Sequence, residues 1–512
     1  MEIEYKFCIP SQRLAALQAA VLRGAHAQIR MEARYFDTAD GALSSRGIAF
    51  RLRREGDRWV QTVKALGNGP LDREEHNLDR GQAHATGSAP EPQPELHADT
   101  VAGTRLLGAL QAASGPLAET YGTEMDRVTR DIAFQGGVVE MALDTGRVIA
   151  HRGTPQEKEA RICELELELK AGPLAGLAVV AARWATRHGL YLSTISKAER
   201  GERLLAPQWA RPATKASPMK TSGSLRHFLD GRALQRAAVA HCLHQILGNA
   251  SEIVEGGGHA EHVHQLRIGI RRLRTALREL APLAPGAFNP AWEPPLVDVF
   301  QRLGQLRDQG QALQSIVADL RDAGAPVSDV CTTTNGAPGA SAAAIVRTPA
   351  FQAALIELMA FAAQGRNAPA ANGEDQALDA KDSRRMLQKR LRSLHAQVRH
   401  DVQDFAALPV EEQHRLRKRL KRLRYLAEFV APALDAEGES FLASLQPALT
   451  ALGRLGDERL AHTLYSKATA TDPRAWFAVG WLAARQGLAV ADCEKALAHI
   501  ADMPRLRKAG KR

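Results

Sequence analysis

Residues 162–170, Ile-Cys-Glu-Leu-Glu-Leu-Glu-Leu-Lys, alternate charged and apolar side chains with a period of two. This alternation is typical of a β-strand whose two faces meet different surroundings. Similar alternation occurs in three other N-terminal segments, at residues 2–7, 48–53 and 138–143. Turn signals at Asp57 and at Gly136-Gly137 fit hairpins between strands. We therefore expect a strand-rich region over residues 1–205, with helices inserted at 12–22, 100–113 and 174–188.

The charges on these alternating segments are sorted by sign. The first segment carries two glutamates and a lysine on one face, and the last carries three glutamates, whereas the second carries two arginines. Carboxylates hold hard divalent cations through oxygen, and guanidinium and ammonium groups neutralise phosphate oxygens. Separate acidic and basic strands therefore suit a metal–polyphosphate complex, and they favour an antiparallel sheet closed into a barrel with a charged interior. An ordinary two-sided sheet with a solvated polar face is the alternative.

Residues 206–223 contain Pro, Lys, Ser and Thr without periodicity and predict a linker. Beyond it the sequence is helical in pattern to residue 508, with low-complexity loops at 324–344 and 365–380. Within this part, residues 263–280 resemble 413–430, and LGQLRD at 303–308 is matched by LGRLGD at 452–457. Two signatures that recur in the same order indicate two copies of one helical unit, at about 224–345 and 375–500. We expect two helical bundles packed about a pseudo-twofold axis.

Each repeated helix carries a basic stripe and an apolar stripe at helical spacing. The basic stripes consist of His264, Arg267, Arg271 and Arg274 in the first helix and of His414, Arg417, Lys421 and Arg424 in the second. The parallel leucine-rich stripes are expected to pack inward. Like charges on adjacent turns repel by about 0.2–0.5 kcal/mol per pair, so a basic stripe that occurs twice favours a bound polyanion. An exposed basic helix without a ligand is the alternative.

The net charge of +10 belongs to the helical part of the chain. Residues 1–205 hold 26 basic and 27 acidic side chains, whereas the remainder holds 41 and 30. Aromatic residues make up 5% of the sequence, which counts against a nucleic-acid binder that stacks bases. The longest apolar runs fall short of the roughly 18 residues of a membrane span, and the N-terminus shows no secretory signal. Five scattered cysteines indicate a reducing compartment, so we expect a cytoplasmic protein without a membrane partner.

Several short motifs follow one another along residues 1–205. They are ExExK at 2–6, RYFDT at 34–38, RLR at 51–53, Lys64, REEHN at 73–77, Arg127, Arg130, ELELELK at 164–170 and SKAERG at 196–201. Together they resemble the CYTH, or triphosphate tunnel metalloenzyme, family. The resemblance implies an eight-stranded antiparallel β-tunnel with helices, which hydrolyses triphosphate compounds with two Mg²⁺ or Mn²⁺ ions.

The resemblance also implies roles for individual residues. The metal ligands would be Glu2, Glu4, Glu166 and Glu168. Catalysis would involve Glu2, Glu4, Lys6 and Lys197. The phosphates would be held by Lys6, Arg51, Arg53, Lys64, Arg127, Arg130, Lys197 and Arg200. Further wall residues would be Glu75, Glu140, Asp144 and Glu164.

The helical part, over about 224–508, has motifs of its own. They are HQLRIGIRRLR at 264–274, LGQLRD, HRLRKRLKRLRY at 414–425 and LGRLGD. These resemble the CHAD domain, a conserved-histidine helical module, and imply two four-helix bundles whose basic cavity binds inorganic polyphosphate through the two basic stripes. The sequence departs from the family pattern at Gln309-Gly310 and at Gly456. The roles of Asp308 and Asp457 stay open, with helix packing through Gly304 and Gly453 as an alternative role of these motifs.

We therefore expect a metal-dependent inorganic triphosphatase that converts tripolyphosphate to pyrophosphate and phosphate. We expect it to be joined to a module that binds long-chain polyphosphate. The protein would then associate with polyphosphate granules. Alternatives keep the tunnel and change the substrate to thiamine triphosphate, to a nucleoside triphosphate, or to ATP cyclised as by a class IV-type adenylate cyclase. A non-catalytic protein that binds polyphosphate or nucleic acid is a further alternative, although no RNA-reading motif is present.

Overall fold

The computed structural model describes residues 2–66, 72–83, 89–219, 229–307, 311–326, 341–364, 377–430 and 437–502. The chain forms two compact units. The first comprises Met1–Thr214, Leu243–His262 and Ala343–Gly365, and the second comprises Lys215–Cys242, Val263–Ala342 and Arg366–Arg512. The first unit thus contains two segments of the helical part in addition to the region expected at 1–205.

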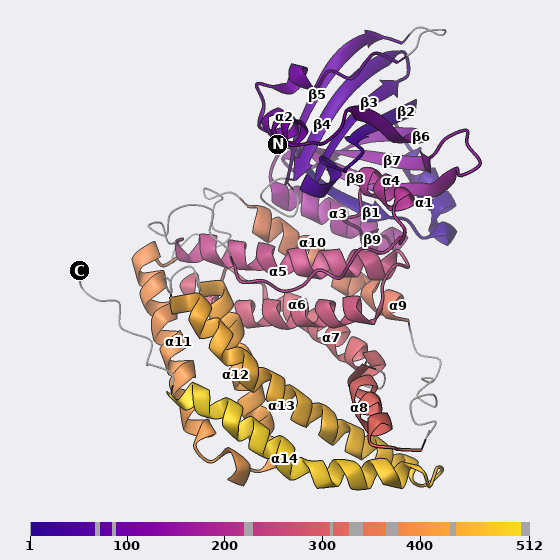
Figure 1. Cartoon of the computed structure of the whole chain (residues 1–512). Coiled ribbons are helices and arrows are strands. Elements are labelled where there is room, and N and C mark those ends of the chain that lie inside the picture. The colour runs from indigo at the N-terminus through magenta and orange to yellow at the C-terminus, as the bar shows by residue number, and fades with distance from the viewer. Residues whose placement is uncertain are drawn as a thin grey trace. The chain divides into compact units, whose positions relative to one another are not determined.

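The first unit is built on one antiparallel sheet (Figure 1). Its strands are β1 (Glu2–Cys8), β2 (Ala27–Thr38), β3 (Ile48–Glu55), β4 (Arg58–Leu66), β5 (Asp72–Gln82), β6 (Leu117–Phe134), β7 (Gly137–Ala150), β8 (Lys158–Ala171) and β9 (Tyr191–Leu192). The strand order is β5-β4-β3-β2-β6-β7-β8-β1-β9, and β1 also pairs with β5. Strands β1 to β8 therefore form a closed circuit, and the expected antiparallel sheet is confirmed.

Two predicted turns lie where the chain reverses between neighbouring strands. Gly56 (φ 61°) lies between β3 and β4, and Gly136 (φ 85°) lies between β6 and β7. Both glycines adopt positive φ, which a residue with a Cβ takes at a cost and glycine takes freely. The glycines fix these hairpins, which keep sequential strands adjacent.

Among the described residues, the first unit contains several α-helices or parts of them, together with the first three residues of α6 (Ala260–Glu279). Apart from α6, they are α1 (Leu14–Val21), α2 (Val101–Gln111), α3 (Leu174–His188), α4 (Lys197–Leu205), the C-terminal half of α5 (Gly231–Val254), α9 (Ala342–Val346) and α10 (Pro349–Ala363). The helices expected at 12–22, 100–113 and 174–188 correspond to the first three. Helix α9 begins inside the segment 324–344 that was expected to be a loop, and residues 327–340 lie outside the described part.

Apolar side chains cover the outer face of the closed sheet. Phe7 on β1 and Leu165 on β8 are both fully buried. Helix α3 packs on β8, and β1 is the neighbour of β8 in the sheet. Tyr5 is also fully buried, and its hydroxyl donates a hydrogen bond of 2.7 Å to the carbonyl of Ile356 in α10. Because side chains alternate along a strand, the charged residues between these apolar ones face the interior. The charged interior expected from the sequence thus has a matching apolar exterior.

Helix α4 closes one part of the interior. Its cap, Ser196, accepts a hydrogen bond of 3.1 Å from the amide of Glu199, the arrangement that Ser-x-x-Glu favours at a helix start. Leu204 packs into an apolar cluster with Tyr35 and Tyr121. A Cβ on Gly201 would overlap the ring of Tyr121, so only glycine lets the helix lie this close. This packing fixes the start of α4, where Lys197 lies.

The second unit is helical among its described residues (Figure 1). Its helices, beside the first half of α5, are α6 (Ala260–Glu279), α7 (Glu293–Arg307), α8 (Gln311–Asp322), α11 (Ala380–Val402), α12 (Val410–Val430), α13 (Glu437–Ala468) and α14 (Ala475–Asp502). The repeated basic segments form α6 and α12, and the two glycine signatures fall on α7 and α13. Of the residues expected to pack inward, those at 266, 270, 273, 280, 416, 420 and 423 are fully buried, whereas Leu277 is half-buried.

The low-complexity segment 365–380 lies largely outside the described residues, and α11 begins at its end. Residues 206–219 of the predicted linker contain neither helix nor strand. The pseudo-twofold relation between bundles stays a prediction. Among the described helices, none is both long and apolar enough to cross a membrane.

Candidate functional site

Strand register determines which charged side chains share the interior of the sheet. Between β1 and β8, Lys6 lies directly opposite Glu166, and Glu4 lies directly opposite Glu168. Directly opposite residues of an antiparallel pair project to the same face, with Cβ atoms about 5 Å apart. Residues from the first strand and from the glutamate-rich strand, 160 positions apart in the sequence, therefore meet on one inner wall.

Three carboxylates on β7 and β8 form a cluster, which we call the acidic triad: Asp144, Glu164 and Glu166. Each contributes an oxygen that lies within 4.8 Å of the other two. Asp144 lies opposite Glu164 in the sheet, and Glu166 follows two residues later on the same face. Asp144 and Glu164 are 0% and 1% exposed. The triad is thus a dense group of buried negative charge.

Two cations neutralise most of this charge. The ammonium of Lys197, the first residue of α4, is 2.7 Å from Asp144 Oδ2 and 2.8 Å from Glu166 Oε1, and it also contacts Glu164. The guanidinium of Arg127 donates to Asp144 at 2.6 and 2.7 Å and to Glu166 at 2.7 Å. Three carboxylates and two cations leave one net negative charge.

The ionisation of these groups follows from the same contacts. Burial opposes ionisation of Asp144 and Glu166, but Lys197 and Arg127 nevertheless hold the pKa of each carboxyl below its usual value. Burial likewise opposes a charged Lys197, and the three carboxylates nevertheless raise its pKa well above its usual value. Asp144 and Glu166 are therefore ionised at neutral pH, as carboxylate ligands of a cation must be.

The acidic triad fits a hard divalent cation. It offers oxygen ligands, the donors that Mg²⁺ and Mn²⁺ prefer. Both carboxylate oxygens of Glu164 are buried without a hydrogen-bond partner of ordinary geometry, although the Lys197 ammonium approaches one of them. The ammonium already lies among the three carboxylates, which indicates that positive charge is stabilised at this position.

Basic residues line the opposite part of the interior. Arg51 is buried, and its Nη1 donates a hydrogen bond of 3.1 Å to the hydroxyl of Tyr35. Burial and the neighbouring Arg51 lower the pKa of Arg53 to about 10. Lys64 contacts Glu75 on the adjacent strand. Cations held this close to one another at little exposure favour binding of a polyanion that would relieve their repulsion.

Most residues predicted for the site lie on this inner face. The register brings together Glu4, Lys6, Arg51, Arg53, Lys64, Glu75, Arg127, Glu140, Asp144, Glu164, Glu166 and Glu168, with Lys197 added from α4. Lys6 Nζ also donates to the carbonyl of Ile195, just before α4. Asp144 and Glu164, which the sequence placed in the wall, lie at the centre of the carboxylate cluster.

Two predicted residues differ from this arrangement. Arg130 lies opposite Met141 on the other face of the sheet. There its Nη1 donates a hydrogen bond of 3.1 Å to the carbonyl of Ala20. Arg200 is engaged by a glutamate from beyond α5 rather than lying along the wall. Glu2 belongs to β1, but its side chain lies outside the described residues.

In the second unit, the basic stripes of α6 and α12 converge. Burial, Arg271 and Arg417 together lower the pKa of Lys421 to about 7, with a smaller effect from Arg267 and an opposing one from Asp457. Groups that act on one ammonium in this way must lie near it. We call Arg267, Arg271, Arg417 and Lys421 the basic cluster.

The remaining predicted residues of the stripes lie in other surroundings. Arg274 and Arg424 each donate to a glutamate at 2.9 Å, which compensates their charge. His414 is exposed and His264 is half-buried. The basic cluster is therefore narrower than the two stripes that the sequence shows.

Glycines of the two repeated signatures make room for arginines of the basic cluster. A Cβ on Gly304 would lie 2.7 Å from Nη2 of Arg267. A Cβ on Gly456 would lie 3.3 Å from Cζ of Arg417 and would overlap its Nη1. Gly304 and Gly456 each admit one guanidinium, although they occupy different positions of the two signatures, and the counterpart of Gly304 in the second signature is Gly453. Asp308 lies outside the described residues.

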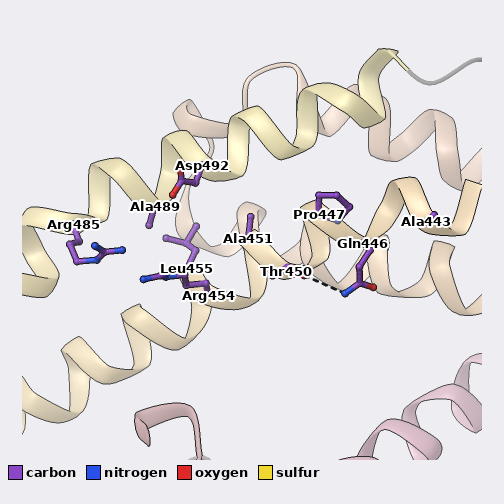
Figure 2. A pocket seen from close by; sticks show the side chains of 10 residues that line it. All are labelled: Ala443, Gln446, Pro447, Thr450, Ala451, Arg454, Leu455, Arg485, Ala489 and Asp492. Atoms are coloured by element: carbon purple, nitrogen blue, oxygen red, sulfur yellow. Dashed lines mark hydrogen bonds between the residues drawn. The ribbon is translucent and has the colours of Figure 1, made fainter. Parts of the chain in front are cut away.

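A separate cavity of about 430 Å³ lies between α13 and α14 (Figure 2). Half of its ten lining residues are alanine, proline or leucine and half are polar or charged, with Arg454 and Arg485 at one end. Both arginines donate to Glu458, at 3.0 and 3.4 Å, so their charges are compensated. We assign no ligand to this cavity.

Sequence patterns missed two acidic residues that contact α4, Glu252 and Glu255. No motif or spacing singled them out, because their arginine partners lie about fifty positions earlier in the sequence.

Comparison with protein families gives two matches. The CYTH domain family model matches residues 1–201, and the CHAD domain family model matches residues 237–466. These ranges agree with the parts of the chain that carry the two sets of motifs.

Individual relatives are distant. An inorganic triphosphatase from Haemophilus influenzae is 28% identical over 217 residues, which are 41% of this chain and 56% of that protein. The chain thus spans about half the length of the curated relative that it matches. Among solved structures, the CHAD domain from the plant Ricinus communis matches with a TM-score of 0.44 and 21% identity, over 58% of this chain and 99% of that chain. A putative adenylyl cyclase from Hippeastrum with a dominant triphosphatase activity has a TM-score of 0.29 and 18% identity, over 40% and 95%.

Proposed function

The chain carries a CYTH domain followed by a CHAD domain, and from this premise we propose that it is a metal-dependent inorganic triphosphatase with a polyphosphate-binding module. The proposed reaction is hydrolysis of tripolyphosphate to pyrophosphate and phosphate. The observation that carries the proposal is the acidic triad facing a wall of arginine and lysine inside one closed sheet. Carboxylates can bind the metal cations, and arginine and lysine side chains can bind the phosphates. Because both kinds of side chain line one interior, this interior suits a metal–triphosphate complex.

The residues of the interior divide into two proposed groups. Asp144, Glu164 and Glu166 would hold one Mg²⁺ or Mn²⁺ ion, and Glu4 with Glu168, opposite each other on β1 and β8, would contribute to a second. When bound, such an ion supplies positive charge to phosphate oxygens and activates water for attack on phosphorus. Glu2 stays a proposed ligand on its position in β1.

The cationic side chains would stabilise the charge that phosphoryl transfer spreads over oxygens. We propose that Lys6, Arg51, Arg53, Lys64, Arg127 and Lys197 bind the phosphates. Arg127 and Lys197 each contact the acidic triad and would connect the bound cation with the substrate. Arg130 is left out of this group because it lies on the other face, and Arg200 because a glutamate engages it.

Phosphate release from a panel of substrates tests the enzyme proposal. Full-length protein would be assayed with tripolyphosphate, ATP, thiamine triphosphate and long-chain polyphosphate, each with Mg²⁺, Mn²⁺ or EDTA. We expect rapid release from tripolyphosphate that EDTA abolishes. Preference for ATP or thiamine triphosphate would move the substrate assignment to that compound, and release unaffected by EDTA would refute the role of the metal.

A matched pair of variants tests the acidic triad. Glu166→Gln removes one triad charge and should lower phosphate release by at least about a hundredfold, since electrostatic groups at such sites contribute about 3–4 kcal/mol to the barrier. Glu159→Gln on the same strand is the control, because this residue is exposed and pairs with Arg147. Equal activity in the two variants would contradict the site.

We propose that the basic cluster of the second unit binds long-chain polyphosphate. Crowded arginine and lysine groups there lower the pKa of Lys421, and a polyanion would relieve that repulsion. Arg271→Gln combined with Lys421→Gln should weaken polyphosphate binding at least tenfold in a fluorescence titration. Arg415→Gln, an exposed position of the same helix that pairs with Glu412, is the control. Unchanged binding in the double variant would refute the proposal.

The thiols of Cys8, Cys163, Cys242 and Cys493 are free, which suits the cytoplasmic location that we propose. Association with polyphosphate granules would follow from the second module. Imaging of a tagged protein beside stained granules, with the double variant as control, tests this.

A further inference from the structure

Two acidic residues near the end of α5 reach arginines of α4 inside the first unit. Glu255 accepts hydrogen bonds from Arg200, and Glu252 accepts hydrogen bonds from Arg203. All four side chains are at least nine-tenths buried. The two glutamates lie in the range that the CHAD family model matches, whereas the arginines lie at the end of the tunnel region. The first unit therefore includes buried partners of α4 that come from the range matched by the CHAD family model.

The two pairs differ in their distance from the acidic triad. Cys8 lies directly opposite Glu164 in the sheet, and Nη2 of Arg200 is 3.7 Å from the Cys8 sulfur. Glu164 is also among the charges that act on Arg200. Arg203 instead contacts Glu199 and lies over the ring of Trp209, away from these groups. Only the first pair borders the proposed cation site.

Glu255 is held in place from several sides. The Ser193 hydroxyl donates to Glu255 Oε1, and the Cys8 thiol lies 3.4 Å from the same oxygen. The backbone amide of Thr194 donates 2.9 Å to Ser251 Oγ, which ties the segment before α4 to α5. The amide of Ser193 donates to the carbonyl of Lys6, so these contacts continue into β1.

We propose that Glu255 is a positioning residue of the triphosphate tunnel, which holds the Arg200 guanidinium away from Glu164, so that no further protein cation joins Lys197 on that carboxylate and competes with a divalent cation. This inference rests on the proposed function. Glu255 touches neither substrate nor metal in this scheme, and it acts through Arg200.

The physical reason is the permanent charge of the guanidinium. Arginine is not deprotonated in proteins, and a buried cation without its partner is strongly unfavourable. If Glu255 lost its charge, Arg200 would turn to the nearest remaining carboxylate. Across Cys8, Glu164 is the carboxylate that acts on Arg200 most strongly after Glu255. An arginine bound there would compete with the cation for the same oxygens.

The test compares Mn²⁺ binding, without substrate, by electron paramagnetic resonance titration of full-length variants. Glu255→Gln should bind Mn²⁺ at least tenfold more weakly than the wild type. Glu252→Gln, the equally buried control one turn away, should bind within twofold of the wild type. Arg200→Gln combined with Glu255→Gln should restore binding to within threefold, because no cation is left to compete.

Three results would overturn the inference: unchanged binding in Glu255→Gln, equal loss in Glu252→Gln, or no recovery in the double variant. If Glu255→Gln alone does not fold, Arg200→Gln gives an independent test, since it should bind Mn²⁺ at least as tightly as the wild type. A wild type that binds no Mn²⁺ would overturn the proposed function itself. The failure of the inference and the failure of the proposed function are thereby distinguished.

Discussion

Replacing Gly456 by alanine should raise the stability of the protein and lower its affinity for polyphosphate. Position 456 lies inside α13, where alanine is favoured over glycine by about 1 kcal/mol. The added Cβ would meet the end of the Arg417 side chain rather than backbone, so the side chain can move aside at little cost. Relief of backbone entropy should then dominate the stability change.

Binding should respond in the opposite direction. A hydrogen bond between charged groups contributes about 1.5–3 kcal/mol. The displaced Arg417 guanidinium keeps its charge near the basic cluster, so we expect the lower end of this range, which is about a tenfold weaker affinity. Fluorescence titration with long-chain polyphosphate measures the affinity, and differential scanning fluorimetry should show a midpoint raised by about 2–4 °C.

Gly453→Ala is the matched control for this prediction. Position 453 lies one turn earlier in α13, and its Cβ would lie 3.9 Å from Arg417, an ordinary contact. This variant should gain the same stability and keep its affinity. If both variants bound polyphosphate equally well, or equally poorly, the idea that Gly456 makes room for Arg417 would be refuted.

Three further predictions concern pH, helix α4 and the extent of the first unit. Because its surroundings lower the pKa of Lys421 to about 7, the ammonium loses its proton as the pH rises through 7. The affinity for polyphosphate should therefore fall between pH 6 and 8.5 in titrations at several pH values. The Lys421→Arg variant should not show this pH dependence. Gly201→Ala would push α4 off Tyr121, so calorimetry should show a loss of about 1–3 kcal/mol and assays a lower turnover. A fragment of residues 1–205 lacks the partners of Tyr5, Arg200 and Arg203, so it should be poorly soluble, whereas full-length protein should not.

The strands were predictable from the sequence where both faces are buried in different surroundings. At 162–170, glutamates face the interior and leucines face α3, so hydropathy alternates without interruption. The same reason explains the success at 2–7, 48–53 and 138–143. Alternation identifies a face, but it says nothing about which strand lies beside which.

The centre of the carboxylate cluster was not predictable for this reason. Asp144 meets Glu164 because β7 pairs with β8 in one particular register. A shift by two residues would have placed Ala142 or Gly146, neither of which carries a carboxylate, opposite Glu164. Glu255 was further out of reach, since its partner Arg200 lies 55 positions earlier and no periodic pattern connects them.

Helix α4 supplies the acidic triad with a counter-ion that is a side chain of the protein itself. Many metal centres lose their fold when a chelator removes the ion, because bare ligands repel one another. Here the ammonium of Lys197, together with Arg127, offsets two of the three carboxylate charges. Dialysis against EDTA should therefore silence the enzyme and leave its fold intact by circular dichroism, which makes the metal a part of the chemistry rather than a part of the architecture.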